Sequence, residues 1–128
     1  MREFTILGER CSGTNFLQKA METNFLVKYK TTRIGWKHFF GHFLPSDDEK
    51  ENVVFIGVVR DPVAWIDSFF RQPHHVPSVL QSSVVEFMSQ PFWSEYDNGV
   101  RIAEDRPFDG GQENHWRNIF ELRTRKNE

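Results

Sequence analysis

The chain has 128 residues, of which 38% are hydrophobic and 15% aromatic, and this content predicts a single compact domain over residues 1–128. Its 16 basic and 18 acidic residues give a formal net charge of -2, so we expect no nucleic-acid partner and no anionic-membrane surface, and any anion site must be local. The single cysteine, Cys11, excludes an internal disulfide framework. No segment approaches the ~20 apolar residues of a membrane span, and without a signal-peptide pattern the sequence predicts a cytoplasmic protein.

Hydrophobic periodicity predicts alternating strands and helices in the first half of the chain. Residues 4–7 form a short apolar run that ends at Gly8, as expected for a buried strand entering a glycine turn. Apolar residues then recur at helical spacing, which predicts a helix over 14–23 with its amino terminus at that turn. A second strand is predicted over 25–29. Residues 53–59 are apolar and rich in β-branched side chains, which predicts the central strand of a parallel sheet covered on both faces.

The other segments predict turns and helices. The acidic segment 45–52 is expected to be a solvated turn, because its carboxylates are adjacent and lack the spacing of a calcium-binding loop. Asp61 and Pro62 predict a helix start, with Asp as the cap and Pro in the first helical position, and this helix should end near Arg71. Two more amphipathic helices are predicted over 78–90 and 112–123, separated by an irregular stretch over 91–111.

This order of elements predicts a three-layer α/β domain, in which a parallel sheet with a P-loop-like strand–loop–helix start carries helices on both faces. Ligands of such domains bind at the carboxyl ends of the parallel strands, where successive loops converge. Three segments should therefore meet there: the loop GERCSGTN (residues 8–15), the segment GWKHFF (35–40) and the junction VVRDP (58–62). The loop would offer an anion its backbone N–H groups and the positive end of a helix dipole.

The loop has the two glycines of a phosphate-binding loop, Gly8 and Gly13, but Thr14 and Asn15 stand where such loops have Lys and then Ser or Thr. Thr14 cannot supply the charge that this lysine brings to the terminal phosphates, and Asn15 poorly replaces the hydroxyl that binds magnesium. A metal-dependent NTPase is therefore disfavoured, and positive charge must come from elsewhere. The available cations are Arg10, Lys37 and Arg60.

At these residues the sequence resembles the sulfotransferases that use 3'-phosphoadenosine 5'-phosphosulfate. A family loop of the type SGTTW grips the 5'-phosphosulfate, and SGTNF is similar to it, with Asn15 and Phe16 in place of the second Thr and the Trp. In the family an Arg at the end of a central strand and a Ser eight residues later bind the 3'-phosphate, and Arg60 and Ser68 of RDPVAWIDS resemble this pair. GWKHFF is similar to the family segment whose Lys and His supply a cation and the general base.

The resemblance implies in-line transfer of a sulfuryl group from 3'-phosphoadenosine 5'-phosphosulfate to an acceptor hydroxyl or amine, with no metal. Lys37 would stabilise the bridging oxygen of the leaving phosphate. His38 would be the base, since an unperturbed imidazole is mostly neutral at pH 7 and can accept a proton. The residues implied to bind the donor nucleotide are Arg10, Cys11, Ser12, Gly13, Thr14, Asn15, Phe16, Arg60 and Ser68.

Several alternatives stay open at the level of sequence. One is a magnesium-dependent P-loop nucleotide kinase or NTPase with an altered loop, and another is a non-catalytic nucleotide-binding remnant. Family members usually run longer than this chain, so the resemblance implies a short or truncated member. His38 could be an ordinary packed histidine, Ser68 could bond its own helix backbone, and Phe16 and Trp65 are expected in the core. The acceptor could be a glycan, a lipid or a small metabolite, and the oligomeric state is open.

Overall fold

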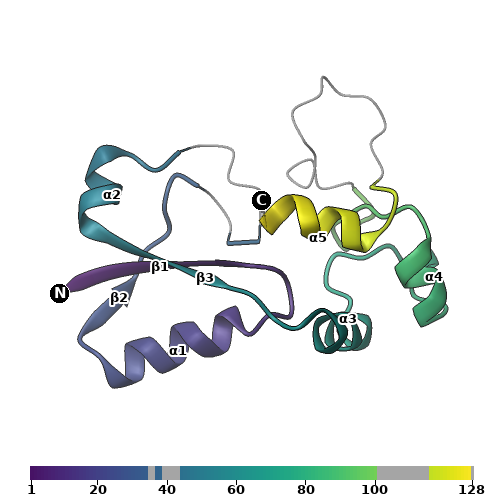
Figure 1. Ribbon diagram of the computed structural model, residues 1–128, viewed down its shortest axis with the longest axis horizontal. Helices are drawn as coiled ribbons and strands as arrows, with labels where there is room; N and C mark the ends of the chain where they lie inside the picture. Colours follow the sequence, from purple (N-terminus) through teal and green to yellow (C-terminus); the bar gives the residue numbers. More distant parts are fainter. Residues whose placement is uncertain (35–36, 39–43, 101–115, 128) are drawn as a thin grey trace. The chain divides into compact units, whose positions relative to one another are not determined.

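The computed structural model describes residues 1–34, 37–38, 44–100 and 116–127, and it shows an α/β chain (Figure 1). Two compact units can be distinguished, Met1–Trp65 and Ile66–Glu128. The first contains a small parallel sheet, and the second is mainly helical. The expectation of one domain over residues 1–128 stays a prediction.

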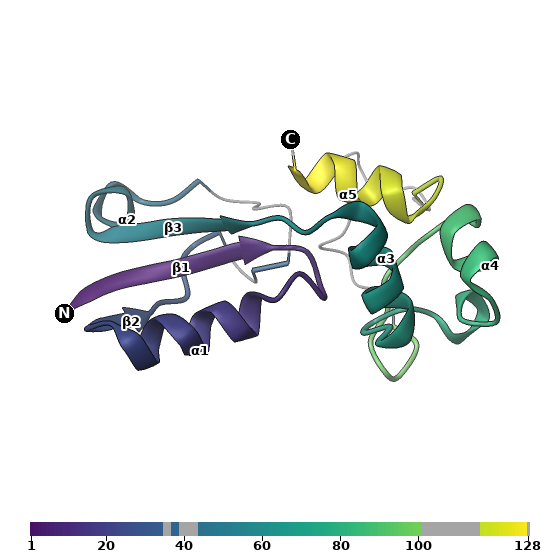
Figure 2. The same cartoon turned by 60° about the horizontal axis from the view of Figure 1, so that its bottom comes forward.

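The sheet of the first unit consists of β1 (Arg2–Gly8), β2 (Val27–Tyr29) and β3 (Val53–Val58), in the order β2-β1-β3 (Figure 2). Both pairings are parallel: β1 aligns with β2 from Arg2 opposite Val27, and with β3 from Glu3 opposite Val53. The predicted strands and their direction are confirmed. All their carboxyl ends therefore lie at one edge of the sheet.

The prediction that the 53–59 strand is central was wrong, because within the described residues β1 lies between the other two strands. β1 buries consecutive residues on both faces, Phe4, Thr5 and Ile6. Val54 of β3 is by contrast 54% exposed. The buried residues of β1 include the polar Thr5, whereas the longer apolar run of β3 does not reflect cover on both faces.

Helix α1 (Thr14–Asn24) confirms the predicted helix over 14–23 and lies along one face of the sheet, against β1 and β2 (Figure 1). Its stripe of half-buried apolar residues, Leu17, Ala20 and Met21, has the spacing of one helical face. β1, the loop and α1 thus form the strand–loop–helix unit that the sequence predicts.

The acidic segment forms a helix, α2 (Asp47–Asn52), and the prediction of a turn was wrong. Ser46 and Glu49 form a capping box: the Ser46 hydroxyl accepts from the Glu49 N–H at 3.2 Å, and the Glu49 carboxylate accepts from the Ser46 N–H at 2.8 Å. Acidic residues in the first turn also stabilise the helix through the positive end of its dipole. The Ser-x-x-Glu spacing of Ser46 and Glu49 is the sequence signal for this helix.

Helix α3 (Pro62–Arg71) has the predicted bounds, and the Asp61 carboxylate caps it by accepting from the N–H groups of Val63 and Ala64, each at 3.0 Å. The predicted helix over 78–90 is divided into η1 (Ser78–Leu80) and α4 (Val84–Ser89). The division has a local cause, since Ser83 adopts an extended backbone and its side chain caps α4 through the Glu86 N–H.

The last helix, α5 (Ile119–Asn127), begins later than the predicted 112–123. Residues 112–115 lie outside the described residues, as do residues 101–111 of the predicted irregular stretch. Trp116 is not helical: it pairs with Phe92 in an isolated antiparallel bridge, and the Asn118 side chain accepts from the Glu121 N–H at the helix start. None of the helices in the described ranges is long and apolar enough to cross a membrane.

Candidate anion-binding site

Gly8 ends β1 at a point where only glycine fits. A Cβ atom at this position would lie 2.7 Å from the Val58 carbonyl oxygen of β3 and 3.1 Å from the Thr14 methyl. The first contact is with backbone, which cannot turn aside as a flexible side chain would. Gly8 therefore lets β3 and the first turn of α1 approach the end of β1 closely.

Hydrogen bonds within the loop and from Trp65 fix the segment between Gly8 and α1. The Ser12 N–H donates to the Glu9 carbonyl at 3.2 Å, and the buried Trp65 indole N–H donates to the Arg10 carbonyl at 2.8 Å. Cys11 and Gly13 have positive φ angles of 60° and 87°. Such a conformation is unusual for cysteine, so the surrounding contacts fix a backbone shape that the residue itself does not favour.

The amino terminus of α1 is open. Its N-cap, Gly13, has no side chain to cap the helix, and the first turn contains no acidic residue. The Leu17 N–H donates to the Gly13 carbonyl at 3.0 Å, but within the described part of the chain no group accepts from the backbone N–H groups of residues 13–16. These donors and the positive end of the helix dipole are what an anion requires.

Lys37 brings a cation to this helix start. Its ammonium donates to the Asn15 side-chain oxygen on the first turn of α1, and its carbonyl accepts from the Gly8 N–H at 2.9 Å. Partial burial lowers the pKa of the Lys37 ammonium, because desolvation disfavours the charged form. The predicted lysine therefore lies beside the loop.

His38 lies against the end of β1. Its Nδ1 is 2.6 Å from the Gly8 carbonyl oxygen, and the residue is only 9% exposed. A carbonyl oxygen can only accept, so Nδ1 carries the proton, and in a neutral ring Nε2 is then the nitrogen with a lone pair. This contact supports the loop, and it also fixes the tautomer that a base acting through Nε2 would need.

Arg60 links the end of β3 to the loop, since its Nη1 donates to the Cys11 carbonyl at 2.9 Å. Two carboxylates close to Arg60 in the sequence have other contacts: Asp61 caps α3, and Asp67 pairs with Arg71. A guanidinium has five N–H donors and can bind a carbonyl oxygen and an anion at the same time. Burial raises the pKa of the Cys11 thiol, and the nearby Arg10 and Arg60 charges only partly oppose this.

The structure thus brings together the predicted segments at the carboxyl ends of β1 and β3, through Lys37, His38 and Arg60 and the loop itself. Residues 35–36 and 39–40 of the second segment lie outside the described residues. Ser68 belongs to the second unit, on α3. Within the described residues its hydroxyl makes no hydrogen bond to its own helix.

Other predicted site residues have varied surroundings. Arg10 is 3% exposed, so its side chain lies inside the protein, and Thr14 is also buried. Trp65 is a core residue, as expected. The expectation of a core position for Phe16 was wrong: this ring is 79% exposed, because it follows Asn15 on the outward side of the first turn of α1.

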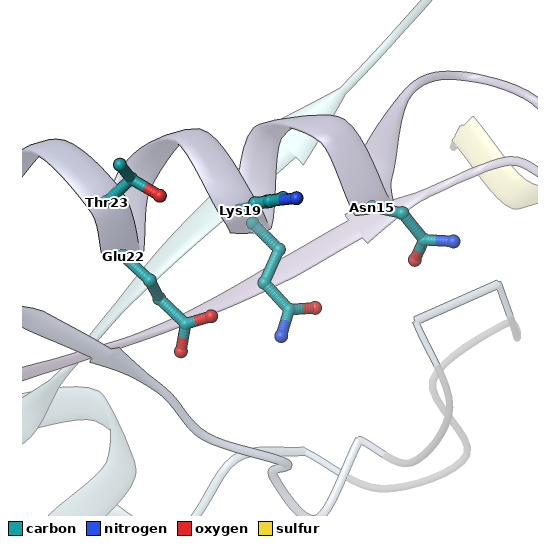
Figure 3. A pocket seen from close by; sticks show the side chains of 5 residues that line it. Asn15, Lys19, Glu22 and Thr23 are labelled. Atoms are coloured by element: carbon teal, nitrogen blue, oxygen red, sulfur yellow. The ribbon is translucent and has the colours of Figure 1, made fainter.

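A shallow pocket of about 420 Å³ lies along α1 beside the loop, and sequence reasoning missed it (Figure 3). Its residues follow helical spacing along one polar face, and this periodicity was the signal that could have revealed it. The lining residues are Asn15, Gln18, Lys19, Glu22 and Thr23. In Figure 3 the Asn15 and Glu22 side chains project from the same side of the helix.

The described residues contain no cluster of three His, Cys, Asp or Glu side chains that could hold a metal ion. Comparisons of the chain with protein-family models, with curated proteins and with solved structures find no match. Function is therefore inferred from the residues of the site.

Proposed function

We propose that this protein is a sulfotransferase that uses 3'-phosphoadenosine 5'-phosphosulfate as its donor. One observation carries the proposal: the backbone N–H groups at the open start of α1 face no acceptor in the described chain, while Lys37 and Arg60 reach the same loop from two other segments. Two cations and an open helix terminus suit a ligand with two anionic groups. The resemblance of SGTNF and RDPVAWIDS to family motifs supports the same donor.

In this proposal the loop residues Ser12, Gly13 and Thr14 bind the 5'-phosphosulfate, chiefly through backbone N–H groups. Arg60 binds the 3'-phosphate, and a part for Ser68 is supported by the resemblance of RDPVAWIDS alone. Phe16 is exposed at the start of α1, where an aromatic ring can stack on the adenine base. The order β1–loop–α1 and the parallel β3 support the finer proposal of a three-layer P-loop-like fold.

The chemistry would be a direct in-line displacement. The acceptor oxygen or nitrogen forms a bond to sulfur while the bond from sulfur to the bridging phosphate oxygen breaks, and that oxygen keeps the electron pair. Lys37 stabilises the negative charge that develops there. His38 Nε2 takes the acceptor proton, because Nδ1 is already committed to the Gly8 carbonyl.

The loop side chains favour this reaction over magnesium-dependent phosphoryl transfer. Thr14 is 4% exposed, and its methyl faces Gly8, so no cation projects from the position of the usual loop lysine. The Asn15 side-chain oxygen contacts Lys37. On this proposal the partners are the nucleotide donor and a glycan, lipid or small-metabolite acceptor, and the reaction takes place in the cytoplasm.

Calorimetric titration tests the proposal. Adenosine 3',5'-bisphosphate should bind in EDTA more tightly than ADP does, and Arg60→Ala should weaken its binding by a factor on the order of ten to a hundred, as for a lost charge-assisted contact. Arg71→Ala is the matched control, since its guanidinium pairs with Asp67, and it should leave the affinity unchanged. A preference for magnesium-ATP would indicate a kinase or NTPase. Absence of binding by folded protein would indicate a remnant without this site.

A further inference from the structure

We propose that Asn15 is a positioning residue, whose side chain holds the Lys37 ammonium at the start of α1 where the anion will bind. This inference rests on the proposed function, and it assigns Asn15 a role that acts through Lys37. The loop position alone would give Asn15 a direct contact to the nucleotide instead.

The contact fixes Lys37 at both ends. Its carbonyl accepts from the Gly8 N–H at 2.9 Å, which sets the backbone beside the end of β1. Its ammonium donates to the Asn15 side-chain oxygen, on the first turn of α1. A free lysine side chain samples many rotamers, and this second attachment selects those that point toward the helix start.

The position of the Lys37 ammonium is energetically unfavourable as long as no anion is bound there. The amino terminus of a helix carries a partial positive charge, which repels a cation. Lys37 is also partly desolvated, and the uncharged Asn15 oxygen compensates only in part. A bound phosphate or sulfonate group would relieve both penalties, so the contact prepares Lys37 for its ligand.

The choice of asparagine suits this role. Its side-chain oxygen stands one bond further from the backbone than a Ser or Thr hydroxyl, so it reaches across to Lys37. It carries no charge, whereas a carboxylate at the same place would neutralise the ammonium and repel the incoming anion. Asn15→Asp should therefore keep the contact and weaken anion binding.

A double-mutant cycle separates positioning from direct contact. Affinity for adenosine 3',5'-bisphosphate is measured by calorimetry in EDTA for Asn15→Ala, Lys37→Met and the double variant. Asn15→Ala should weaken binding about tenfold in the parent protein and hardly at all in the Lys37→Met background, since the role of Asn15 requires Lys37. An equal loss in both backgrounds would overturn the inference and leave the proposed function standing.

The control is Gln18→Ala, which removes a carboxamide from the next turn of the same helix face. Gln18 makes no hydrogen bond to Lys37 among the described residues, so this variant should bind the bisphosphate as the parent does. A tenfold loss in Gln18→Ala would show that any change on this face weakens binding, and it would count against a specific role for Asn15.

A ligand-free measurement decides the inference even if no nucleotide binds. NMR of the lysine NH₃⁺ groups detects ammonium protons that are protected by a persistent hydrogen bond, and Lys37→Met identifies the Lys37 signal. This signal should be present in the parent, Gln18→Ala and Asn15→Asp proteins and absent in Asn15→Ala. Its persistence in Asn15→Ala would overturn the inference. Correct NMR behaviour without nucleotide binding would instead reject the proposed function alone.

Discussion

At the scale of the residue, the two loop glycines are required for different reasons. Gly8 is required by close approach, because a Cβ atom there would lie only 2.7 Å from the Val58 carbonyl oxygen. Gly13 is required by its φ of 87°, and a Cβ atom there would meet nothing within 4 Å. Their spacing was evident in the sequence, but only the structure shows which glycine responds to which constraint.

These different reasons predict unequal costs of substitution. Gly13→Ala should lower the free energy of unfolding by about 1–2 kcal/mol, the usual cost of a left-handed backbone with a Cβ atom. Gly8→Ala should cost more, about 3 kcal/mol, at the upper end for overpacking, because backbone atoms of β3 must move. Urea denaturation of both variants measures the difference. Equal costs would show that the approach of β3 to Gly8 is not tight.

Because of Lys37, we expect anion binding to weaken at alkaline pH. Because burial lowers its pKa, the ammonium loses its proton below the ordinary lysine value of 10.5. Affinity for adenosine 3',5'-bisphosphate should therefore fall as the pH rises toward that value, and the affinity of Lys37→Met should be lower and nearly constant. Cys11 also titrates in this range, with its pKa raised above 9.0, so the series is measured in a Cys11→Ser background. An unchanged pH dependence in Lys37→Met would contradict the prediction.

The same lowered pKa has a consequence for stability. The folded state disfavours the charged form of Lys37, so the group destabilises the ligand-free protein at neutral pH, and this penalty is lost as the pH rises from the folded-state pKa to the unfolded lysine value of 10.5. Lys37→Met should then leave the Tm of the ligand-free protein unchanged or higher while it weakens anion binding. A large fall in Tm would mean that Lys37 has a structural role instead.

At the scale of the element, local signals predicted most of the first unit. Apolar runs gave the three strands, helical periodicity gave α1, and the Asp-Pro pair gave the start of α3. The position of each strand in the sheet was harder to predict from the sequence, because the burial of β1 depends on which strands pair with it. The break between η1 and α4 has a local cause instead: the apolar stripe predicts one continuous helix, but the Ser83 cap starts a new one.

Helix α2 is stabilised by the contacts of one carboxylate, Glu49. The Glu49 carboxylate accepts from the N–H groups of Ser46 and Arg33, at 2.8 and 2.9 Å, and these bonds lower its pKa. They tie α2 to the segment that follows β2. The stabilisation is present above the unfolded carboxyl value of 4.5 and is lost as the pH falls through the folded-state pKa.

Glu49→Gln should therefore lower the Tm at neutral pH and reduce the loss of stability on acidification. Glu51→Gln is the matched control, because Glu51 is an exposed carboxylate on the same helix, and it should change neither quantity. Thermal unfolding followed by circular dichroism between neutral and acid pH measures both. Identical curves for the two variants would show that the Glu49 contacts do not contribute to stability.

At the scale of the whole molecule, parallel topology allowed the sequence to predict which separate segments lie together. Parallel strands place their carboxyl ends together, so Lys37, His38 and Arg60 were expected beside the loop although they are far apart in the sequence, and the structure confirms this. The individual contacts were not predictable. That Lys37 meets Asn15, or that His38 meets the Gly8 carbonyl, depends on tertiary packing over more than twenty residues of sequence separation.

The most direct test of the central claim is a two-dimensional ¹H–¹⁵N NMR titration of the protein with adenosine 3',5'-bisphosphate in EDTA. If the start of α1 holds the 5'-phosphate, the amide signals of residues 13–16 should shift most, because their N–H groups gain an acceptor that the described chain does not provide. The shifts should shrink in Arg60→Ala at equal ligand concentration. Binding that leaves these four amides unmoved would contradict the account.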